Sequence, residues 1–311
     1  MADRATLPLG DAVASAPAGR LMRMATYASV AVGLVLIAVK LLAWLGTGSV
    51  ALLSSLIDST LDAAASILNL VAVRQALVPA DRQHRFGHAK AEPLAGLAQS
   101  AFIAGSGLLL IAEAIKRLVD PQPVTHGLGG VAVMVFSILL TILLVWFQKI
   151  VVARTGSLAI NADFLHYTSD LMMNAGVIVA LLLSSLFDVP LLDPLFALAI
   201  AGFILYSASR IAWQSFNLLM DRELPDSDRQ RIKDICASYP QVRNVHDLRT
   251  RSAGLQCFIQ LHLELDGEMS LRQAHAVSDT VEAAIRAAFP AADVIIHEDP
   301  AGIDEPRPVF K

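Results

Sequence analysis

Six long apolar stretches constrain this chain more than any other feature of its sequence. A membrane-spanning helix needs about 20 predominantly apolar residues, and every stretch reaches that length. They cover residues 26–46, 50–75, 92–114, 127–148, 158–187 and 191–213. Soluble domains do not carry so many such runs, so the sequence predicts an all-α membrane domain of six transmembrane helices.

Charged residues divide the chain into two parts. Residues 1–221 contain 26 of them, and the remaining 90 residues contain another 26, a density close to the roughly 25% of soluble domains. The net charge of −4 indicates no nucleic-acid partner. We expect a cytoplasmic N-terminal tail (1–23), a six-helix transmembrane domain (24–221), a cytoplasmic domain (222–300) and a flexible C-terminal tail (301–311).

Lysine and arginine in the short loops predict how the helices cross the membrane. The N-terminal tail and the loops after the second and fourth stretches carry nine of these residues. The loops after the first, third and fifth stretches carry only Lys116 and Arg117. Because cytoplasmic loops are enriched in positive charge, both termini and the soluble domain are expected in the cytoplasm.

Two apolar stretches carry ionisable side chains four residues apart, Asp58 with Asp62 and His166 with Asp170. Residues i and i+4 share one helix face, and ionised groups inside a membrane are costly and usually functional. If the two faces meet, three carboxylates and one imidazole can hold Zn²⁺ tetrahedrally. Two alternatives stay open, namely polar pairs that only join the helices and a proton relay. Asp163 is interpreted as a helix-start residue.

The loop after the second stretch contains a second candidate set. Asp81, His84 and His88 fall within eight residues, and Gly87 permits a bend between them. Such a set can close on one cation, and a solvated polar loop without metal is the alternative.

The soluble part alternates between helical and strand patterns. Residues 227–240 and 270–290 have helical apolar spacing, with Ser227 as the expected cap of the first helix. Residues 242–254 and 255–267 form an expected hairpin, and 292–300 a final strand. The order αββαβ indicates a small α+β domain of ferredoxin-like type.

The histidines of the soluble part form a third candidate set. They are His246, His262, His275 and His297. Asp299 follows two residues after the last, and these nitrogen and oxygen ligands indicate a metal site, with two metals bridged by Asp299 as one arrangement. Metal-free surface and core histidines are the alternative. Cys236 and Cys257 form no CxxC pair and are interpreted as small buried side chains.

Six motifs of the chain resemble those of the cation diffusion facilitator family. They are LIDSTLD, HRFGHAKAEP and FLHYTSD in the membrane part, and VHDLRTR, FIQLHLELDG and DVIIHEDP in the soluble part. The similarity is greatest to the bacterial zinc and ferrous-iron efflux transporters of that family, and it covers residues 20–300.

The resemblance implies a secondary active transporter, not an enzyme. It implies a homodimer in the bacterial inner membrane that exports divalent metal in exchange for protons by alternating access. Expected partners are a second copy, metal ions, protons and the bilayer. Zn²⁺ is the expected substrate and the ligand of regulatory sites, without an organic cofactor. Nitrogen and oxygen ligands also suit Fe²⁺, Cd²⁺ and Co²⁺, so the sequence does not select the physiological metal.

By position, the resemblance also assigns roles to residues. The transport site matches Asp58, Asp62, His166 and Asp170. The loop and tail sets match further metal sites. Lys90 and Asp221 match an ion pair at the dimer junction, and Leu165 matches a residue of an inner hydrophobic gate.

Overall fold

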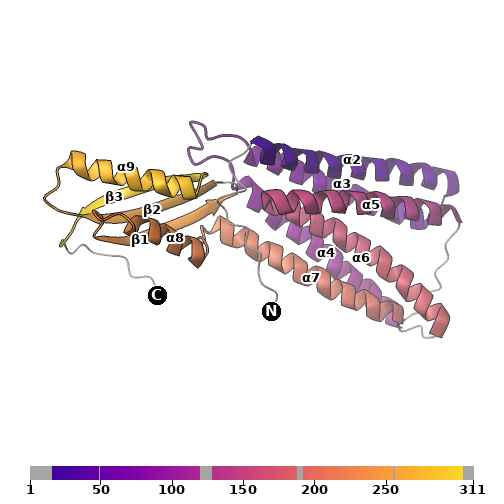
Figure 1. Cartoon of the computed structure of the whole chain (residues 1–311). Helices are drawn as coiled ribbons and strands as arrows, with labels where there is room; N and C mark the ends of the chain where they lie inside the picture. The colour runs from indigo at the N-terminus through magenta and orange to yellow at the C-terminus, as the bar shows by residue number, and fades with distance from the viewer. Residues whose placement is uncertain (1–15, 49, 120–127, 188–191, 255, 304–311) are drawn as a thin grey trace. The chain divides into compact units, whose positions relative to one another are not determined.

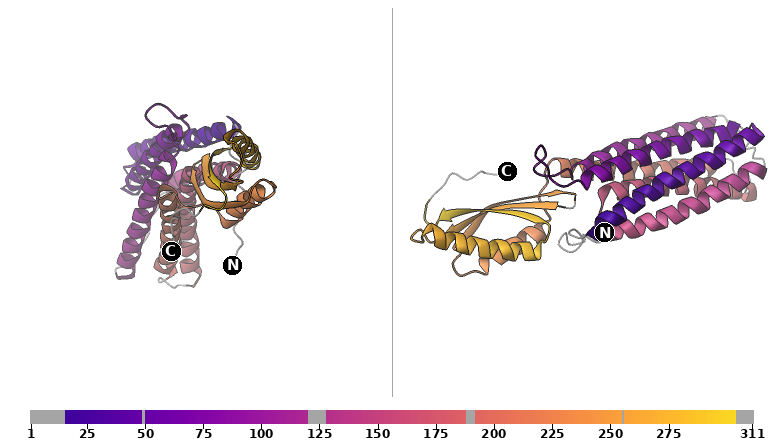
Figure 2. Two further views of the ribbon diagram at one scale, coloured as in Figure 1. Left: turned by 90° about the vertical axis from the view of Figure 1, so that its left-hand side faces the viewer. Right: turned by 90° about the horizontal axis from the view of Figure 1, so that it is seen from above.

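The computed structural model describes residues 16–48, 50–119, 128–187, 192–254 and 256–303. The N-terminal 15 residues and the last eight, which belong to the two predicted tails, lie outside this set. The chain divides into two compact units, one of Gly19–Phe216 and one that contains Asn217–Lys311. Figures 1 and 2 show the first as a helix bundle and the second as a small sheet with helices.

Six long helices occupy the places of the six apolar stretches. They are α2 (Ala16–Thr47), α3 (Val50–Ala76), α4 (Ala91–Val119), α5 (Leu128–Thr155), α6 (Leu158–Phe187) and α7 (Leu192–Leu219). Five of them, α2, α3, α4, α5 and α7, are long and apolar enough over their described residues to cross a membrane. The chain therefore has a transmembrane helical domain.

Helix α2 begins earlier than the sequence analysis expects. Residues 16–23, assigned there to the N-terminal tail, form its first two turns. Pro17 is tolerated because the first turn of a helix makes no use of its N–H groups. Met22 and Ala25 are fully buried, so packing also stabilises this extension. A helix of 32 residues is about 48 Å long, which exceeds the thickness of a hydrocarbon core of about 30 Å.

Burial in the bundle is reversed relative to a soluble protein. Polar side chains such as Ser29, Gln99 and Gln148 are buried, whereas Leu109 and Trp146 are 73% and 65% exposed. An apolar exterior around a polar interior suits a lipid environment, where buried polar groups satisfy one another.

Small residues allow the helices to approach closely, as in other membrane bundles. A Cβ added to Gly96 of α4 would lie 2.6 Å from the Ser215 Oγ of α7, and one added to Gly107 would lie 3.1 Å from Ile204. A Cβ on Gly33 of α2 would lie 3.1 Å from the Cβ of Ala63 on α3.

The described residues 224–254 and 256–303 form five elements. They are α8 (Asp226–Ala237), β1 (Asn244–Ala253), β2 (Gln256–Leu265), α9 (Leu271–Ala288) and β3 (Ala292–Pro300). The sheet order is β1-β2-β3, with β1 antiparallel and β3 parallel to β2. Helices α8 and α9 pack on one face of the sheet (Figure 2) around a core that includes Ile232, Leu261 and Ile285. The other face carries the histidines of β1, β2 and β3.

The expected cap of the first tail helix is wrong. Helix α8 begins at Asp226 after Pro225, so Ser227 lies inside its first turn, and Pro225 makes no side-chain cap. Two carboxylates in that turn, Asp226 and Asp228, favour the start electrostatically because they lie at the positive end of the helix dipole. Helix α9 does use serine, since Ser270 and Gln273 form a capping box.

The two cysteines are free and buried, as expected. Burial raises the pKa of both thiols to about 11. The thiols therefore stay protonated at neutral pH, which makes them poor nucleophiles and poor metal ligands.

Candidate metal sites

The transmembrane candidate site is formed where α3 meets α6. The Nε2 of His166 lies 3.1 Å from Oδ1 of Asp62 and 3.8 Å from Oδ2 of Asp170. The imidazole is 5% exposed, whereas the two carboxylates are 25% and 23% exposed. Because His166 and Asp170 are four residues apart on α6, both face α3, and one atom from each of the three residues lies within 4.8 Å of the others.

These separations suit a metal ion. Two ligand atoms bound to tetrahedral Zn²⁺ lie about 3.3 Å apart, given bonds of about 2.0 to 2.1 Å. The distances from the His166 nitrogen, 3.1 and 3.8 Å, lie on either side of that value. Small side-chain rotations would therefore bring the three atoms around one ion.

The fourth residue of the predicted set, Asp58, stands slightly apart. It is exposed and lies one turn before Asp62 on α3. It is not part of the group of three atoms, but it lines the same cavity of about 430 Å³ as Asp62 and Asp170. The structure thus brings three of the four predicted ligands together and places the fourth on the cavity wall.

The interpretation of Asp163 as a helix-start residue is wrong. Helix α6 begins at Leu158, so Asp163 lies in its second turn, where it is fully buried. Its carboxylate accepts hydrogen bonds from Ser29 of α2 at 2.6 Å and Gln148 of α5 at 2.7 Å. Longer ones come from Ser66 of α3 and Gln99 of α4, both at 3.4 Å. One carboxylate therefore joins α6 to four other helices.

A second buried carboxylate holds the start of α6. Glu92 in the first turn of α4 accepts hydrogen bonds from the Ser157 hydroxyl at 2.5 Å and from the backbone N–H of Ala159 at 3.2 Å. It satisfies N–H groups at the positive end of α6, which no intrahelical carbonyl reaches. Glu92 and Asp163 together fix the first two turns of the helix that carries His166.

Sequence reasoning missed both carboxylates as anchors of α6. Two signals for Asp163 were present in the sequence. It lies three residues before His166, on the same side of the helix, and polar residues interrupt the other apolar stretches. The partners of Asp163 come from four separate stretches, so no local pattern joins them.

The loop site is assembled as expected from its spacing. Oδ2 of Asp81 lies 3.4 Å from Nε2 of His88, and Nδ1 of His84 lies 3.1 Å from that same nitrogen. Gly87 has φ of 78°, so the expected bend depends on glycine. The backbone N–H groups of His84 and Gln83 hold the pKa of Asp81 below its usual value, which keeps the carboxylate ionised and able to bind a cation.

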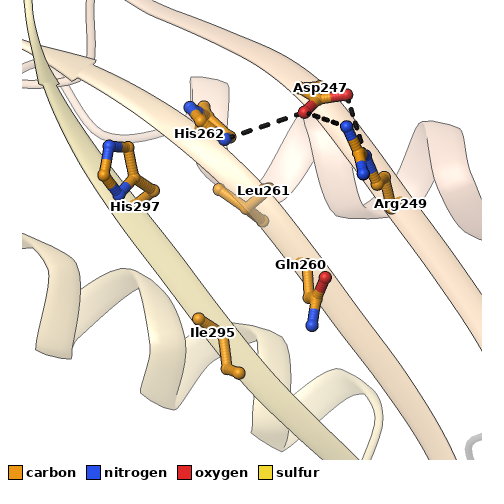
Figure 3. Close-up of a pocket in the computed structure, with 7 residues that line it drawn as sticks. All are labelled: Asp247, Arg249, Gln260, Leu261, His262, Ile295 and His297. Carbon is orange, nitrogen blue, oxygen red and sulfur yellow. Dashed lines mark hydrogen bonds and ion pairs between the residues drawn. The ribbon is translucent and has the colours of Figure 1, made fainter. Parts of the chain in front are cut away.

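The tail site follows from the register of the sheet. His246, His262 and His297 are direct partners across β1, β2 and β3, so their side chains stand in one row on one face. Glu264 and Asp299 are partners in the next row of that face. Figure 3 shows His262 and His297 side by side on the two parallel strands.

Asp299 lies between two sets of histidine nitrogens. Its Oδ2 is 2.8 Å from Nδ1 of His262 and 3.2 Å from Nε2 of His246. Its Oδ1 is 3.2 Å from Nε2 of His297. The carboxylate is 7% exposed, and its two oxygens face different imidazoles, which is the geometry that a bridging ligand requires.

Two carboxylates that the sequence analysis did not select lie near the remaining ring nitrogens of His246 and His262. Nδ1 of His246 lies 2.9 Å from Oε1 of Glu264. Nε2 of His262 lies 3.7 Å from Oδ2 of Asp247, which also pairs with Arg249 at 2.9 Å (Figure 3). Metal-binding histidines usually donate their second N–H to a carboxylate, which fixes the ring and its tautomer.

A β-bulge explains why Asp247 reaches this site. In a regular strand, adjacent residues point to opposite faces, so Asp247 would face away from His246. The register shifts between His246 and Arg249, and Asp247 has φ of 47°, a conformation that aspartate tolerates better than most residues. The bulge turns its side chain toward His262.

His275 lies apart from the other tail ligands. It is on α9, 70% exposed, and its nearest charged neighbours are Asp279 at 3.6 Å and Glu298 at 3.9 Å. It is not part of the group formed by His246, His262 and Asp299. Its role as a ligand stays a prediction.

Leu165, Lys90 and Asp221 received their roles only through the family resemblance, and the structure shows the surroundings of each. Leu165 packs against a buried apolar cluster that includes Ile103 and Ile204. Lys90 directly precedes α4, and Asp221 follows α7 and pairs with Arg251 at 3.4 Å. The gate at Leu165 and the pair of Lys90 with Asp221 stay predictions.

Comparison with known proteins matches both units to family models. The cation efflux transmembrane domain matches residues 26–220, and the cytoplasmic domain of cation efflux proteins matches residues 224–301. The cation-efflux pump FieF of Cronobacter sakazakii is 49% identical over 285 residues, which cover 92% of this chain and 95% of the relative. FieF of Shewanella oneidensis is 50% identical over 283 residues, which cover 91% and 95%.

Solved structures of related domains also match part of this chain. One of them is the metal-bound C-terminal domain of the CzcD transporter from Thermotoga maritima, at 30% sequence identity and a TM-score of 0.25. The match covers 25% of this chain and 93% of that one.

Proposed function

The chain belongs to the cation efflux family of membrane transporters, and on this premise we propose that it exports Zn²⁺ from the cytoplasm in exchange for protons. Cd²⁺ and Fe²⁺ are further proposed substrates. The proposal includes six membrane passes in a bacterial inner membrane, cytoplasmic termini and a homodimer.

The observation that carries the proposal is the meeting of Asp62, His166 and Asp170 inside the transmembrane unit. Ionisable groups at such a depth are costly unless they are paired or bind an ion. Two carboxylates and an imidazole from two helices offer a divalent cation oxygen and nitrogen ligands at fitting separations. Asp58, on the wall of the same cavity, is the proposed fourth ligand.

Exchange with protons follows from the chemistry of these ligands. Carboxylates and imidazole bind metal only when deprotonated, so binding releases protons. A proton on His166 therefore occupies the same nitrogen that a metal ion would bind. In the outward-facing state, protons from outside compete with the metal for the same atoms and displace it. Proton entry thereby drives metal export.

Alternating access requires the cavity to open to one side at a time. Leu165 precedes His166 directly and packs among apolar side chains, so it is the proposed seal on the cytoplasmic side. Glu92 and Asp163 keep the cytoplasmic end of α6 anchored, and we propose that they hold the ligands of α6 in register with Asp62 during the cycle.

The tail is the proposed regulatory part. Its histidines and Asp299 would take up metal when the cytoplasmic concentration is high. Binding would join side chains of β1, β2 and β3 on one face of the sheet. Coupling to transport requires that the metal-bound tail favour one conformation of the membrane part.

The test is metal flux into proteoliposomes of the full-length protein under an imposed pH gradient. Asp62→Ala and Asp170→Ala should abolish Zn²⁺ transport, because each removes one of four proposed ligands. Thr60→Ala is the matched control, since Thr60 is a polar residue of α3, exposed and hydrogen-bonded only within its own helix among the described contacts.

Two results would contradict the proposal. Flux of Asp62→Ala and Asp170→Ala at the rate of the unchanged protein would refute the site. Zn²⁺ flux that does not respond to the size or sign of the pH gradient would refute proton exchange. A panel of Zn²⁺, Cd²⁺, Fe²⁺ and Co²⁺ in the same vesicles ranks the substrates.

A further inference from the structure

A lysine lies in the wall of the transport cavity. Lys40 is the single charged residue of α2 after Arg23. Its ammonium donates hydrogen bonds to the Ser59 hydroxyl at 2.6 Å and to the Ser55 carbonyl at 3.2 Å, both on α3. Ser59 is adjacent to Asp58 in the chain, so the ammonium is held at the turn of α3 where the carboxylates begin.

The same cavity of about 430 Å³ is lined by Lys40, Asp58, Asp62 and Asp170. The ammonium and the three carboxylates therefore share one cavity wall. Glu113 lines the cavity as well, but it is exposed and has an interaction partner of its own. Asp58 is exposed as well, so the described lining of the cavity carries four carboxylates and one ammonium.

Carboxylates outnumber the ammonium in this cavity, so the cavity attracts a cation. The ammonium lowers that attraction, because it repels the same cation in a cavity of low dielectric constant.

We propose that Lys40 is a fixed counter-cation of the transport cavity, which limits how tightly the carboxylates hold a divalent cation and so permits its release. This inference depends on the proposed transport site. Without the ammonium, the carboxylates would bind the metal more tightly, because no fixed cation would oppose them. Release to the outside would then become slower, because the metal leaves against a larger attraction.

A packing role for Lys40 predicts something different. Its hydrogen bonds join α2 to α3, so a residue needed only for packing would lose transport through poor folding or a distorted site. Either defect would weaken metal binding. The counter-cation role predicts tighter binding together with slower turnover, a combination that a distorted site does not produce.

The experiment measures Zn²⁺ transport by the full-length protein in proteoliposomes and Zn²⁺ binding by calorimetry in detergent. Lys40→Met and Lys40→Gln should lower both KM and Kd roughly tenfold and lower the maximal rate by a similar factor, since one charge acts on a divalent ion across a partly solvated cavity. Lys40→Arg keeps the charge and should stay close to the unchanged protein. Lys116→Met is the matched control, because Lys116 is exposed on α4 and does not line the cavity.

Several outcomes would overturn the inference. Unchanged or weaker binding in Lys40→Gln, which keeps hydrogen-bond donors for Ser59 but not the charge, would do so even if Lys40→Met fails to fold. An Arg variant as impaired as the Met variant would assign Lys40 to packing. Asp62→Ala in the same assays separates the two proposals. If it transports normally, the site is wrong, whereas if it is inactive while Lys40→Gln binds normally, only the counter-cation role falls.

Discussion

Asp299→Ala should weaken metal binding by the cytoplasmic tail more than any other single change there. Its Oδ2 lies 2.8 and 3.2 Å from the nitrogens of His262 and His246, and its Oδ1 lies 3.2 Å from that of His297. The substitution therefore removes a ligand from both proposed metal positions at once, whereas loss of one histidine affects one position.

The size of the effect follows from the number of ligands. The binding free energy of Zn²⁺ at structural sites is about 10–16 kcal/mol, which is roughly 3 kcal/mol for each of four ligands. A loss of roughly 3 kcal/mol raises a dissociation constant about 100-fold. We therefore expect Asp299→Ala to weaken both tail sites by about two orders of magnitude, and His297→Ala to weaken one of them by the same factor while the other persists.

Calorimetry with Zn²⁺ on the full-length protein measures this change. Both proteins that are compared, with and without Asp299→Ala, also carry Asp62→Ala and Asp170→Ala, so that the transmembrane site does not contribute to the measured binding. The loop site is intact in both proteins and cancels in the comparison. Asp293→Ala is the matched control, because Asp293 is an exposed carboxylate of the same strand, six residues and about 20 Å from Asp299. Tail affinities within threefold of those of the protein without Asp299→Ala, or an equal loss in Asp293→Ala, would refute the bridging arrangement.

Three further predictions concern buried or partly buried groups. Asp163→Asn should lower the thermal midpoint of the full-length protein, because an amide cannot accept from every donor that a carboxylate satisfies, at a cost of about 1–3 kcal/mol; a midpoint equal to that of the unchanged protein contradicts the anchoring role. Glu264→Gln should weaken the metal site at His246 by about tenfold without abolishing it, and calorimetry with an unchanged dissociation constant would show that Glu264 does not fix the ring. Cys236 and Cys257, with thiol pKa values of about 11, should resist iodoacetamide at pH 8 in the folded protein and react once it is unfolded; mass spectrometry that finds rapid native alkylation argues against their burial.

Local sequence patterns were sufficient to predict the positions of the membrane helices and the residue types that could bind metal. Apolar length predicted where the helices of the bundle lie, because any segment crossing a bilayer must satisfy its backbone internally and face lipid. The spacing of Asp58 with Asp62 and of His166 with Asp170 placed each pair on one helix face, since helical periodicity is local. Alternation of apolar and polar residues likewise marked residues 255–267 as a strand.

Helix starts were less well predicted than helix positions. The pattern of apolar residues marked the membrane stretch of α2 but not its first turns, which are stabilised by the burial of Met22. Ser227 was a plausible cap by residue type, yet the cap position is Pro225 and α8 starts at Asp226, two residues earlier than a cap at Ser227 implies. Both errors have the same cause, because the choice between neighbouring start residues depends on contacts outside the helix.

The meeting of these faces was decided by the tertiary structure. Asp62 approaches His166 because α3 packs against α6, and two residues 104 positions apart give no local sign of such contact. Asp163 is an anchor and not a helix start because its donors come from four other helices. Asp247 faces His262 because a bulge breaks the alternation that the sequence predicts. The sequence by itself therefore determined which side chains are chemically able to bind metal, whereas packing between distant segments decided which of them share a site, since burial and convergence depend on every helix or strand that contributes a neighbour.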